Sequence, residues 1–520
     1  MIDIFMLVMI ILLSIVLLVI SLYLLVYYCH PDDAGFGSGL ICKIFAILGL
    51  SVCWAQVLLL PLDVSNTRGA GGGIRMDLLW EIVYISIACF VFGIIPLLTS
   101  FYECDPDWTC CEKITNGFCF FITQLIVVIL LFGVGYAFLS VAEVPILAVN
   151  CPITGLKKFP KSSDEFSKVE NCTETDTYLK INVGFPIFAI GLLSFISYFL
   201  FVVFGGIGIF ALPLDMIYSF CTRPKKISGA KLETMKKEIV ETAADLKDLG
   251  IQIQKMEKDG IHKKSIFSSD KRHYNQLLNQ LKVGVAVIDE EYELVNIQNM
   301  IDGKSILGYY CSMIFGVIFL IISILWVLHF VLYVVITPGG KPVTDGINIL
   351  LVYLTERGVS FISIAIFAFF CIYLLLATIK GNFKFGVRVV ILGSIHPMKK
   401  NETYMNSILF NIMLFMITSV SVNQFCVKAF NEYAAMTDID LIFSTQIKYL
   451  QFFVYFYRYN VFEYMLCAIM LISLIYLILR PSDSNSMKKI LYAQQEKEKK
   501  AEESSKEKLI EMRNTSIKEP

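Results

Sequence analysis

Several ionisable side chains stand inside stretches of this sequence that are otherwise apolar. They are His329, Glu356, Arg357, Arg458 and Glu463. A charged group in the hydrocarbon core of a membrane costs a few kcal/mol unless it is paired or hydrated. Such groups therefore either join helices as ion pairs or line a polar pathway. Counting helical turns places all five in the same half of the membrane on three segments, and Asp63 lies where it could join their rim. An ion-pair cluster and a polar cavity both remain open.

The cysteines offer a second kind of chemistry. Cys104, Cys110 and Cys111 lie close together, with Cys29 and His30 on a neighbouring loop. Zinc takes four nitrogen or sulfur ligands in a tetrahedron. The irregular spacing lacks a C-x-x-C pair, so we predict no metal site. Cys110 and Cys111, next to a membrane segment, are candidates for acylation or are inert thiols.

Two further features concern the segment that we expect to face the exterior. Cys151 and Cys172 are candidates for a disulfide there. The sequon Asn171-Cys172-Thr173 marks Asn171 as a candidate N-glycosylation site.

No enzymatic constellation is present in the sequence. We find no G-x-S-x-G, H-E-x-x-H or Walker A pattern, and the five histidines are widely separated. The run Gly205-Gly206-x-Gly208 lies inside an apolar stretch, where glycine allows a neighbouring helix to approach closely. We therefore expect neither an enzyme nor a bound cofactor.

The elements that position these residues must be membrane helices. The chain has 520 residues, of which 56% are hydrophobic and only 17% are charged. So little polar surface cannot cover so large an apolar mass in water, so the lipid bilayer is the expected solvent. The net charge of -1 gives no basic face for nucleic acid.

Stretches of about 20 apolar residues are long enough to cross a bilayer as helices. The sequence predicts an all-α, polytopic transmembrane helix bundle of about nine spans. The windows are Ile4–Tyr28, Leu40–Leu62, Trp80–Tyr102, Gly117–Val141, Val183–Leu214, Ser305–Ile336, Val352–Ile379, Tyr404–Val427 and Tyr449–Leu479.

Basic residues set the expected orientation, because Lys and Arg are retained on the cytoplasmic side. The segments 219–304 and 380–400 and the tail after Arg480 are all rich in lysine. They share one side only if the N-terminus is outside and the C-terminus is cytoplasmic. That choice puts the loop 142–180 outside, where glycosylation of Asn171 is possible.

The segment 231–299 carries two apolar stripes at helical spacing on otherwise charged helices, which predicts a helical hairpin. We expect four regions: spans one to five at 1–218, with the exterior loop 142–180; a cytoplasmic charged helical hairpin at 219–304; spans six to nine at 305–480; and a cytoplasmic charged tail at 481–520.

Short motifs along the whole chain carry a family resemblance. They are Tyr23-Leu-Leu-Val-Tyr-Tyr28 before His30-Pro-Asp-Asp33; Leu60-Pro-Leu-Asp-Val-Ser-Asn66; Phe204-Gly-Gly-Ile-Gly208 before Leu212-Pro-Leu214; Arg223-Pro-Lys225; Ile395-His-Pro-Met-Lys399; Met405-Asn-Ser407; Gln424-Phe-Cys426; and Tyr459-Asn-Val-Phe462. In their order and spacing the chain resembles the limb-region / lipocalin-interacting membrane receptor (LIMR) family, particularly its plant and protist members. The exterior loop and the central segment depart from the family pattern.

The resemblance implies a multi-pass, N-outside membrane protein with a receptor-like or endocytic role, in the plasma membrane or an endolysosomal membrane. We therefore expect a receptor or scaffold in membrane trafficking or ligand uptake, which binds an exterior ligand of unknown identity and could bind a cytoplasmic protein at 231–299. The alternative is a transporter or channel for a small or amphipathic solute, which would use the polar cluster of the first paragraph as its cavity.

Overall fold

The fold is described from a computed structural model. It describes residues 4–33, 39–68, 73–104, 110–150, 173–221, 229–259, 269–302, 306–338, 341–385, 387–389, 393–395, 398 and 400–479. The chain divides into two compact units. One comprises residues 1–214 and 318–478, and the other comprises residues 215–317 and 479–520.

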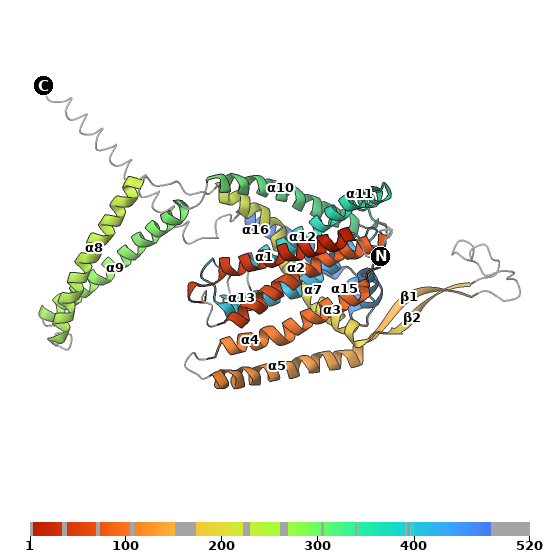
Figure 1. The fold of residues 1–520 in the computed structure, drawn as a ribbon, viewed down its shortest axis with the longest axis horizontal. Coiled ribbons are helices and arrows are strands. Elements are labelled where there is room, and N and C mark those ends of the chain that lie inside the picture. The colour runs from red at the N-terminus through yellow and green to blue at the C-terminus, as the bar shows by residue number, and fades with distance from the viewer. Residues whose placement is uncertain are drawn as a thin grey trace, which may run out of the picture. The chain divides into compact units, whose positions relative to one another are not determined.

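The first unit is a bundle of long helices (Figure 1). Its N-terminal part contains α1 (Ile4–Tyr28), α2 (Leu40–Arg68), α3 (Met76–Cys89), the π-helix η2 (Phe90–Ile94), α4 (Ile95–Tyr102), α5 (Cys110–Leu139), β1 (Val141–Asn150), β2 (Thr173–Asn182) and most of α7 (Phe185–Cys221). The rest contains the C-terminal part of α10 (Ile306–Phe330), the π-helix η5 (Val331–Val335), α11 (Gly346–Glu356), α12 (Ser360–Phe385), β3 (Val387–Val389), β4 (Gly393–Ile395), α13 (Met405–Ala429), α14 (Asp438–Asp440), the π-helix η7 (Leu441–Ile447), α15 (Phe453–Arg458) and α16 (Val461–Leu479).

The second unit contains the predicted helical hairpin, α8 (Gly229–Lys258) and α9 (Ser269–Asp302). The two helices pack against each other, and the Leu246 side chain lies over Gly284. Leu232 and Ile253 on α8 and Tyr274 on α9 are buried, whereas Val285 of the predicted stripe is 45% exposed. The apolar stripes therefore account for the pairing of the helices only in part.

The predicted all-α membrane class is confirmed. Eight described helices are long and apolar enough to cross a membrane. In addition, α1 has 25 residues and no charged residue. Strands within the described residues form only two antiparallel pairs, β1 with β2 and β3 with β4.

Two of the predicted span windows are divided in the structure. The window Val352–Ile379 joins the end of α11 to α12, but the chain turns between them at Gly358, whose φ is 81°. The window Tyr449–Leu479 is interrupted at Asn460, whose φ is 50°, between α15 and α16. A left-handed backbone ends a right-handed helix, and glycine and asparagine adopt it most readily. The spans there are α12 and α16.

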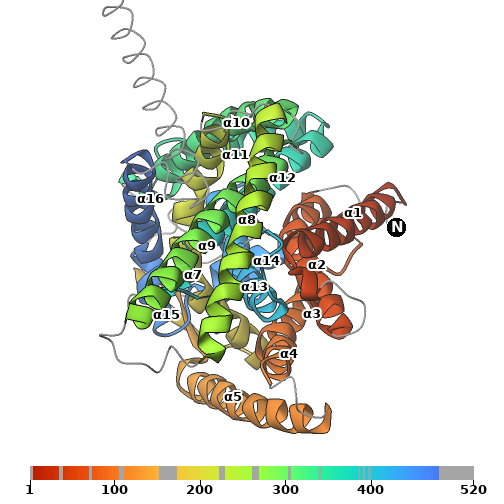
Figure 2. The same ribbon diagram turned by 90° about the vertical axis from the view of Figure 1, so that its left-hand side faces the viewer.

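The helix α13 lies at the centre of the bundle. Its most apolar window is 78% buried, whereas that of the peripheral helix α5 is 11% buried. Figure 2 shows α5 at the edge of the bundle beside α4. Residues on α13 are therefore surrounded by protein, and those on α5 mostly face the surroundings of the bundle.

Glycines set the closest helix contact in the bundle. A Cβ on Gly208 of α7 would lie 1.7 Å from the Ala377 carbonyl oxygen, and one on Gly381 of α12 would lie 1.8 Å from the Phe204 carbonyl oxygen. The two helices thus touch through their backbones, as small residues permit in membrane bundles. This explains the glycine run inside the fifth predicted span as a packing feature.

The strands β1 and β2 form a ribbon that projects from one end of the bundle, called here the ribbon end (Figure 1). The base of β1 is fixed to the bundle, because Glu143 N donates to Tyr449 O and Gln451 N donates to Val141 O. A two-stranded ribbon is marginal by itself in water, so this attachment supports it. The sequence predicted a loop here and missed the strand pairing.

Candidate functional site

A row of polar side chains runs through the middle of α13, the most enclosed helix. Its members are buried within the bundle: Thr418, Ser419, Ser421, Asn423 and Gln424. Ser419 Oγ donates to Gln56 Oε1 at 2.7 Å, and Asn423 Nδ2 donates to Gln56 O at 3.0 Å, which joins α13 to α2. Ser421 Oγ donates to Ser197 Oγ at 2.7 Å on α7. Buried polar groups are stabilised by such hydrogen bonds, so these bonds help to fix how the three helices meet, although Asn423 Oδ1 and Gln424 Oε1 have no partner among the described residues.

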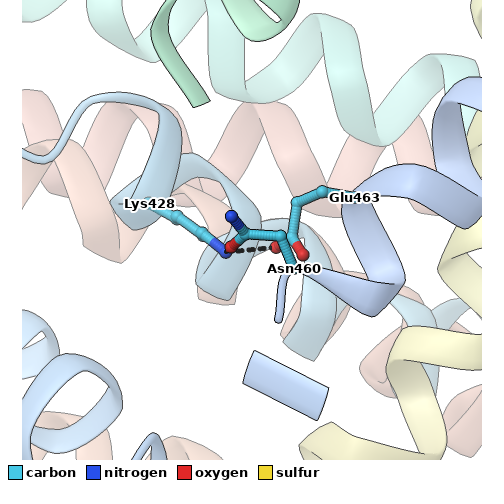
Figure 3. A network of polar contacts seen from close by, with 3 residues as sticks. All are labelled: Lys428, Asn460 and Glu463. Carbon is cyan, nitrogen blue, oxygen red and sulfur yellow. Dashed lines mark hydrogen bonds and ion pairs between the residues drawn. The ribbon is translucent and has the colours of Figure 1, made fainter. Parts of the chain in front are cut away.

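The row ends in a buried ion pair between α13 and α16 (Figure 3). Lys428 Nζ lies 2.6 Å from Glu463 Oε1 and donates a second hydrogen bond of 2.8 Å to Asn460 Oδ1. The Glu463 side chain is 0% exposed and that of Lys428 is 32% exposed. The carboxylate is therefore fully enclosed by the bundle, and the lysine reaches it from a partly exposed position.

Local sequence explains why this pair forms. Lys428 is in the last turn of α13 and Glu463 is in the first turn of α16. Each charge therefore interacts favourably with the partial charge of opposite sign at its own helix end. Asn460 presents its side chain from the left-handed turn before α16, and Phe462 beside it is fully buried with its ring 4.5 Å from that of Tyr198.

The structure does not gather the other predicted ionisable residues around this pair. Glu356 and Arg357 are exposed where α11 ends, and Arg357 lies over the Tyr353 ring. Arg458 is exposed at the end of α15. All three lie next to the two points where the predicted helices are interrupted. The continuous helices that would have aligned them in one half of the membrane are therefore not formed.

His329 is buried, but it makes a different contact. One ring nitrogen lies 2.8 Å from the Ala429 carbonyl oxygen, and the ring stacks on Tyr333 and Phe430. It secures the C-terminal end of α13, which also carries Lys428. The cluster predicted from the sequence contained His329 and Glu463 but not Lys428, which is the partner of Glu463. The eighth predicted window ended at Val427, so sequence reasoning treated Lys428 as a flanking residue.

Asp63 is a second buried carboxylate, at the ribbon end of the bundle. Its Oδ2 atom accepts hydrogen bonds from Trp80 Nε1 at 2.8 Å and from Ile439 N at 3.1 Å. The second donor belongs to the start of the helical turns α14 and η7, where a negative charge is favourable. Asp63 therefore joins α2, α3 and the 430–440 segment, and does not contribute to the Lys428 pair.

Other predicted sites fall where little is described. Cys110 and Cys111 belong to α5, but their side chains are not among those described, and Asn171, Cys151 and Cys172 lie outside the described residues. No group of three or more metal-binding side chains occurs in the described part of the chain. Burial raises the pKa of the Cys29 thiol, which keeps it protonated at neutral pH.

Comparison with known proteins places the chain in a family. A model of the family described as "LMBR1-like membrane protein" matches residues 6–281 and 290–475. The chain belongs to this family. It is 33% identical over 496 residues to a LIMR family protein of Dictyostelium discoideum, which covers 89% of this chain and 95% of that protein. A LIMR family protein of Oryza sativa is 32% identical over 488 residues, covering 89% and 93% respectively. No solved structure matches the chain.

Motifs that carry the family resemblance have packing roles in the structure. Asp33, from the His30-Pro-Asp-Asp33 motif, accepts hydrogen bonds from Tyr102 and from the backbone amide of Met405 at the start of α13. His30 stacks on Tyr404 with ring centroids 4.6 Å apart. Together with the Lys428 pair, these contacts hold α13 at both ends.

Proposed function

We propose that this LMBR1-like protein is a receptor or scaffold in membrane trafficking or ligand uptake, without catalytic activity, in the plasma membrane or an endolysosomal membrane. One observation carries the proposal: the buried charges of Lys428 and Glu463 pair with each other across two helices. Neither residue lines the groove of about 880 Å³ beside α5 or the hollow of about 270 Å³ between α1, α2 and α13. Intramembrane charges that pair between helices support a packing role rather than a solute pathway.

The β1–β2 ribbon supports a binding role at the ribbon end of the bundle. It carries exposed apolar side chains, with Tyr178 55% exposed and Leu179 48% exposed. Exposed apolar and aromatic groups on an element that is fixed at its base are typical of a surface that meets a partner. Under the predicted orientation, this surface faces the exterior ligand, and α8 and α9 face a cytoplasmic partner.

A photo-crosslinking amino acid at Tyr178 in intact cells tests the binding role. We expect a discrete adduct that is lost when the neighbouring Leu179, which is 48% exposed, is changed to Asp, because the partner contacts the apolar surface of the ribbon. The same crosslinker at Leu471, which is 63% exposed on α16, is the matched control and should capture lipid. The proposal fails if Tyr178 gives no adduct, or if Leu179→Asp leaves the adduct unchanged.

Reconstitution in liposomes tests the alternative of a transporter or channel. The receptor proposal expects no ion or solute flux above that of empty liposomes. Flux that is abolished in Lys428→Met/Glu463→Gln, while that variant stays folded, would instead establish transport through the charged pair.

The proposed orientation also predicts a glycan at Asn171. Asn171→Gln should increase gel mobility after expression in a eukaryotic membrane system. Mobility equal to that of the wild-type sequence from the same system would remove this support.

A further inference from the structure

A long apolar groove opens on the side of the bundle between α3, η2 and α4 on one wall and α5 and α7 on the others. Its volume is about 880 Å³, and its walls include Phe92, Leu97, Ile129, Phe132 and Leu193. We call it the α5 groove. Its volume falls in the range of ~300–1,000 Å³ that is usual for sites of small molecules.

The α5 groove lies where α5 meets η2 and α7 mainly through aromatic side chains. The Phe132 ring meets Phe92 with centroids 5.4 Å apart, and Tyr136 meets Phe185 at 5.4 Å. Between these contacts, Gly93 and Gly133 line the groove, and a Cβ on either would meet nothing within 4 Å. Missing side chains thus leave flat, open wall on both sides.

The surroundings of the groove restrict what can occupy it. The helices that form its walls are candidate membrane spans, so the groove opens into hydrocarbon and takes its occupant from the bilayer. It extends from Glu81 to Leu97 along one wall, which is about 24 Å at 1.5 Å rise per helical residue. The occupant is therefore a long apolar molecule that lies along the bilayer normal.

Charge selects among such molecules. Glu81 is the only charged residue among the described side chains of the wall, and it lies toward the end of α3 that is nearer the ribbon end of the bundle. A carboxylate accepts hydrogen bonds from a hydroxyl and repels a phosphate. The polar head of the occupant is therefore a hydrogen-bond donor without a net negative charge.

We propose that the α5 groove binds a membrane sterol, with its hydroxyl donating to Glu81 and its apolar body extending along the groove toward Gly93 and Gly133. A rigid, flat lipid suits a preformed wall that lacks side chains, and it loses less conformational freedom on binding than a flexible acyl chain does. The π-helix η2, which includes Gly93, forms this wall, and π-helical turns occur often at functional sites. This site is separate from the ribbon of the proposed receptor function.

Photolabelling of the full-length protein tests the proposal. A photoreactive, alkyne-tagged sterol should label the wild-type chain on the groove walls, within residues 81–97, 121–133 and 185–193. Unlabelled sterol should compete and phosphatidylcholine should not. Gly133→Leu places a side chain in the groove at a position where its Cβ meets nothing within 4 Å, and it should reduce labelling roughly tenfold. Gly308→Leu is the matched control, because Gly308 on α10 also has nothing within 4 Å of a Cβ, and its labelling should stay unchanged.

A second variant keeps the test decisive if Gly133→Leu does not fold. Glu81→Lys should lower sterol labelling and raise labelling by a photoreactive phosphatidic acid, whereas the exposed Glu356→Lys should change neither. Adducts outside the three segments would overturn the proposal. Equal competition by phosphatidylcholine would also overturn it and would show that the groove holds ordinary bilayer lipid.

Discussion

Removing either charge of the Lys428–Glu463 pair should destabilise the protein, and by unequal amounts. Lys428→Met leaves the Glu463 carboxylate, which is 0% exposed, without its cation. Its second oxygen, Oε2, is buried and has no hydrogen-bond partner among the described residues. Breaking a buried pair from one side costs about 3–5 kcal/mol, so we expect a loss of this size in the free energy of unfolding.

Glu463→Gln should cost less, about 1–2 kcal/mol, because glutamine keeps a hydrogen-bond acceptor. Lys428 is also 32% exposed, so the ammonium that remains is less enclosed by the bundle than the carboxylate is. The double variant Lys428→Met/Glu463→Gln contains neither charge. It should therefore be more stable than Lys428→Met alone, with a coupling free energy of about 1–3 kcal/mol.

Equilibrium unfolding in mixed micelles measures these free energies for the full-length chain. The matched control is Arg458→Met, which removes an exposed cation close to the same helix end and should change stability by less than about 0.5 kcal/mol. Additive effects of the two single changes would refute the pairing. So would a loss in Arg458→Met as large as that in Lys428→Met.

Three further predictions concern other contacts. Gly208→Ala should cost about 1–3 kcal/mol by overpacking, because its Cβ would lie 1.7 Å from a backbone oxygen; a thermal melt no lower than that of Gly133→Ala, where nothing lies within 4 Å, would contradict this. Asp63→Ala should lower stability by about 1–3 kcal/mol, since two buried donors lose their acceptor; an unchanged melting temperature would argue against it. Cys151 and Cys172 directly flank Asn150 and Thr173, which pair with each other, so non-reducing peptide mapping should recover them as one disulfide, and recovery of two alkylated thiols would disprove it.

Hydropathy predicts the membrane helices well, because a span needs many apolar residues in a row and few other elements do. It failed where a helix ends for a local backbone reason. Gly358 and Asn460 adopt left-handed conformations inside apolar stretches, and neither residue type is rare enough within spans to mark a break. Glu356, Arg357 and Arg458 were consequently assigned to continuous helices in one half of the membrane, whereas they lie beside those breaks.

The candidate site was predictable only in part. The cost of a lone carboxylate in lipid allowed either an interhelical ion pair or a polar pathway for Glu463, and the structure shows a cross-helix partner. Which cation supplies it depends on how α13 and α16 pack, and these helices are separated by 31 residues of irregular and short helical structure. The β1–β2 ribbon was missed for a similar reason, since its strands pair across 22 intervening residues and neither has a clear alternating pattern.

The central place of α13 sets an order for the synthesis of the chain. This helix is made after most of the others, yet it supplies the partners of Gln56 on α2 and of Ser197 on α7. Until residue 429 has left the ribosome, those earlier helices wait in the membrane with polar groups that lipid cannot satisfy. An unfinished chain therefore leaves uncovered polar groups that the completed bundle satisfies.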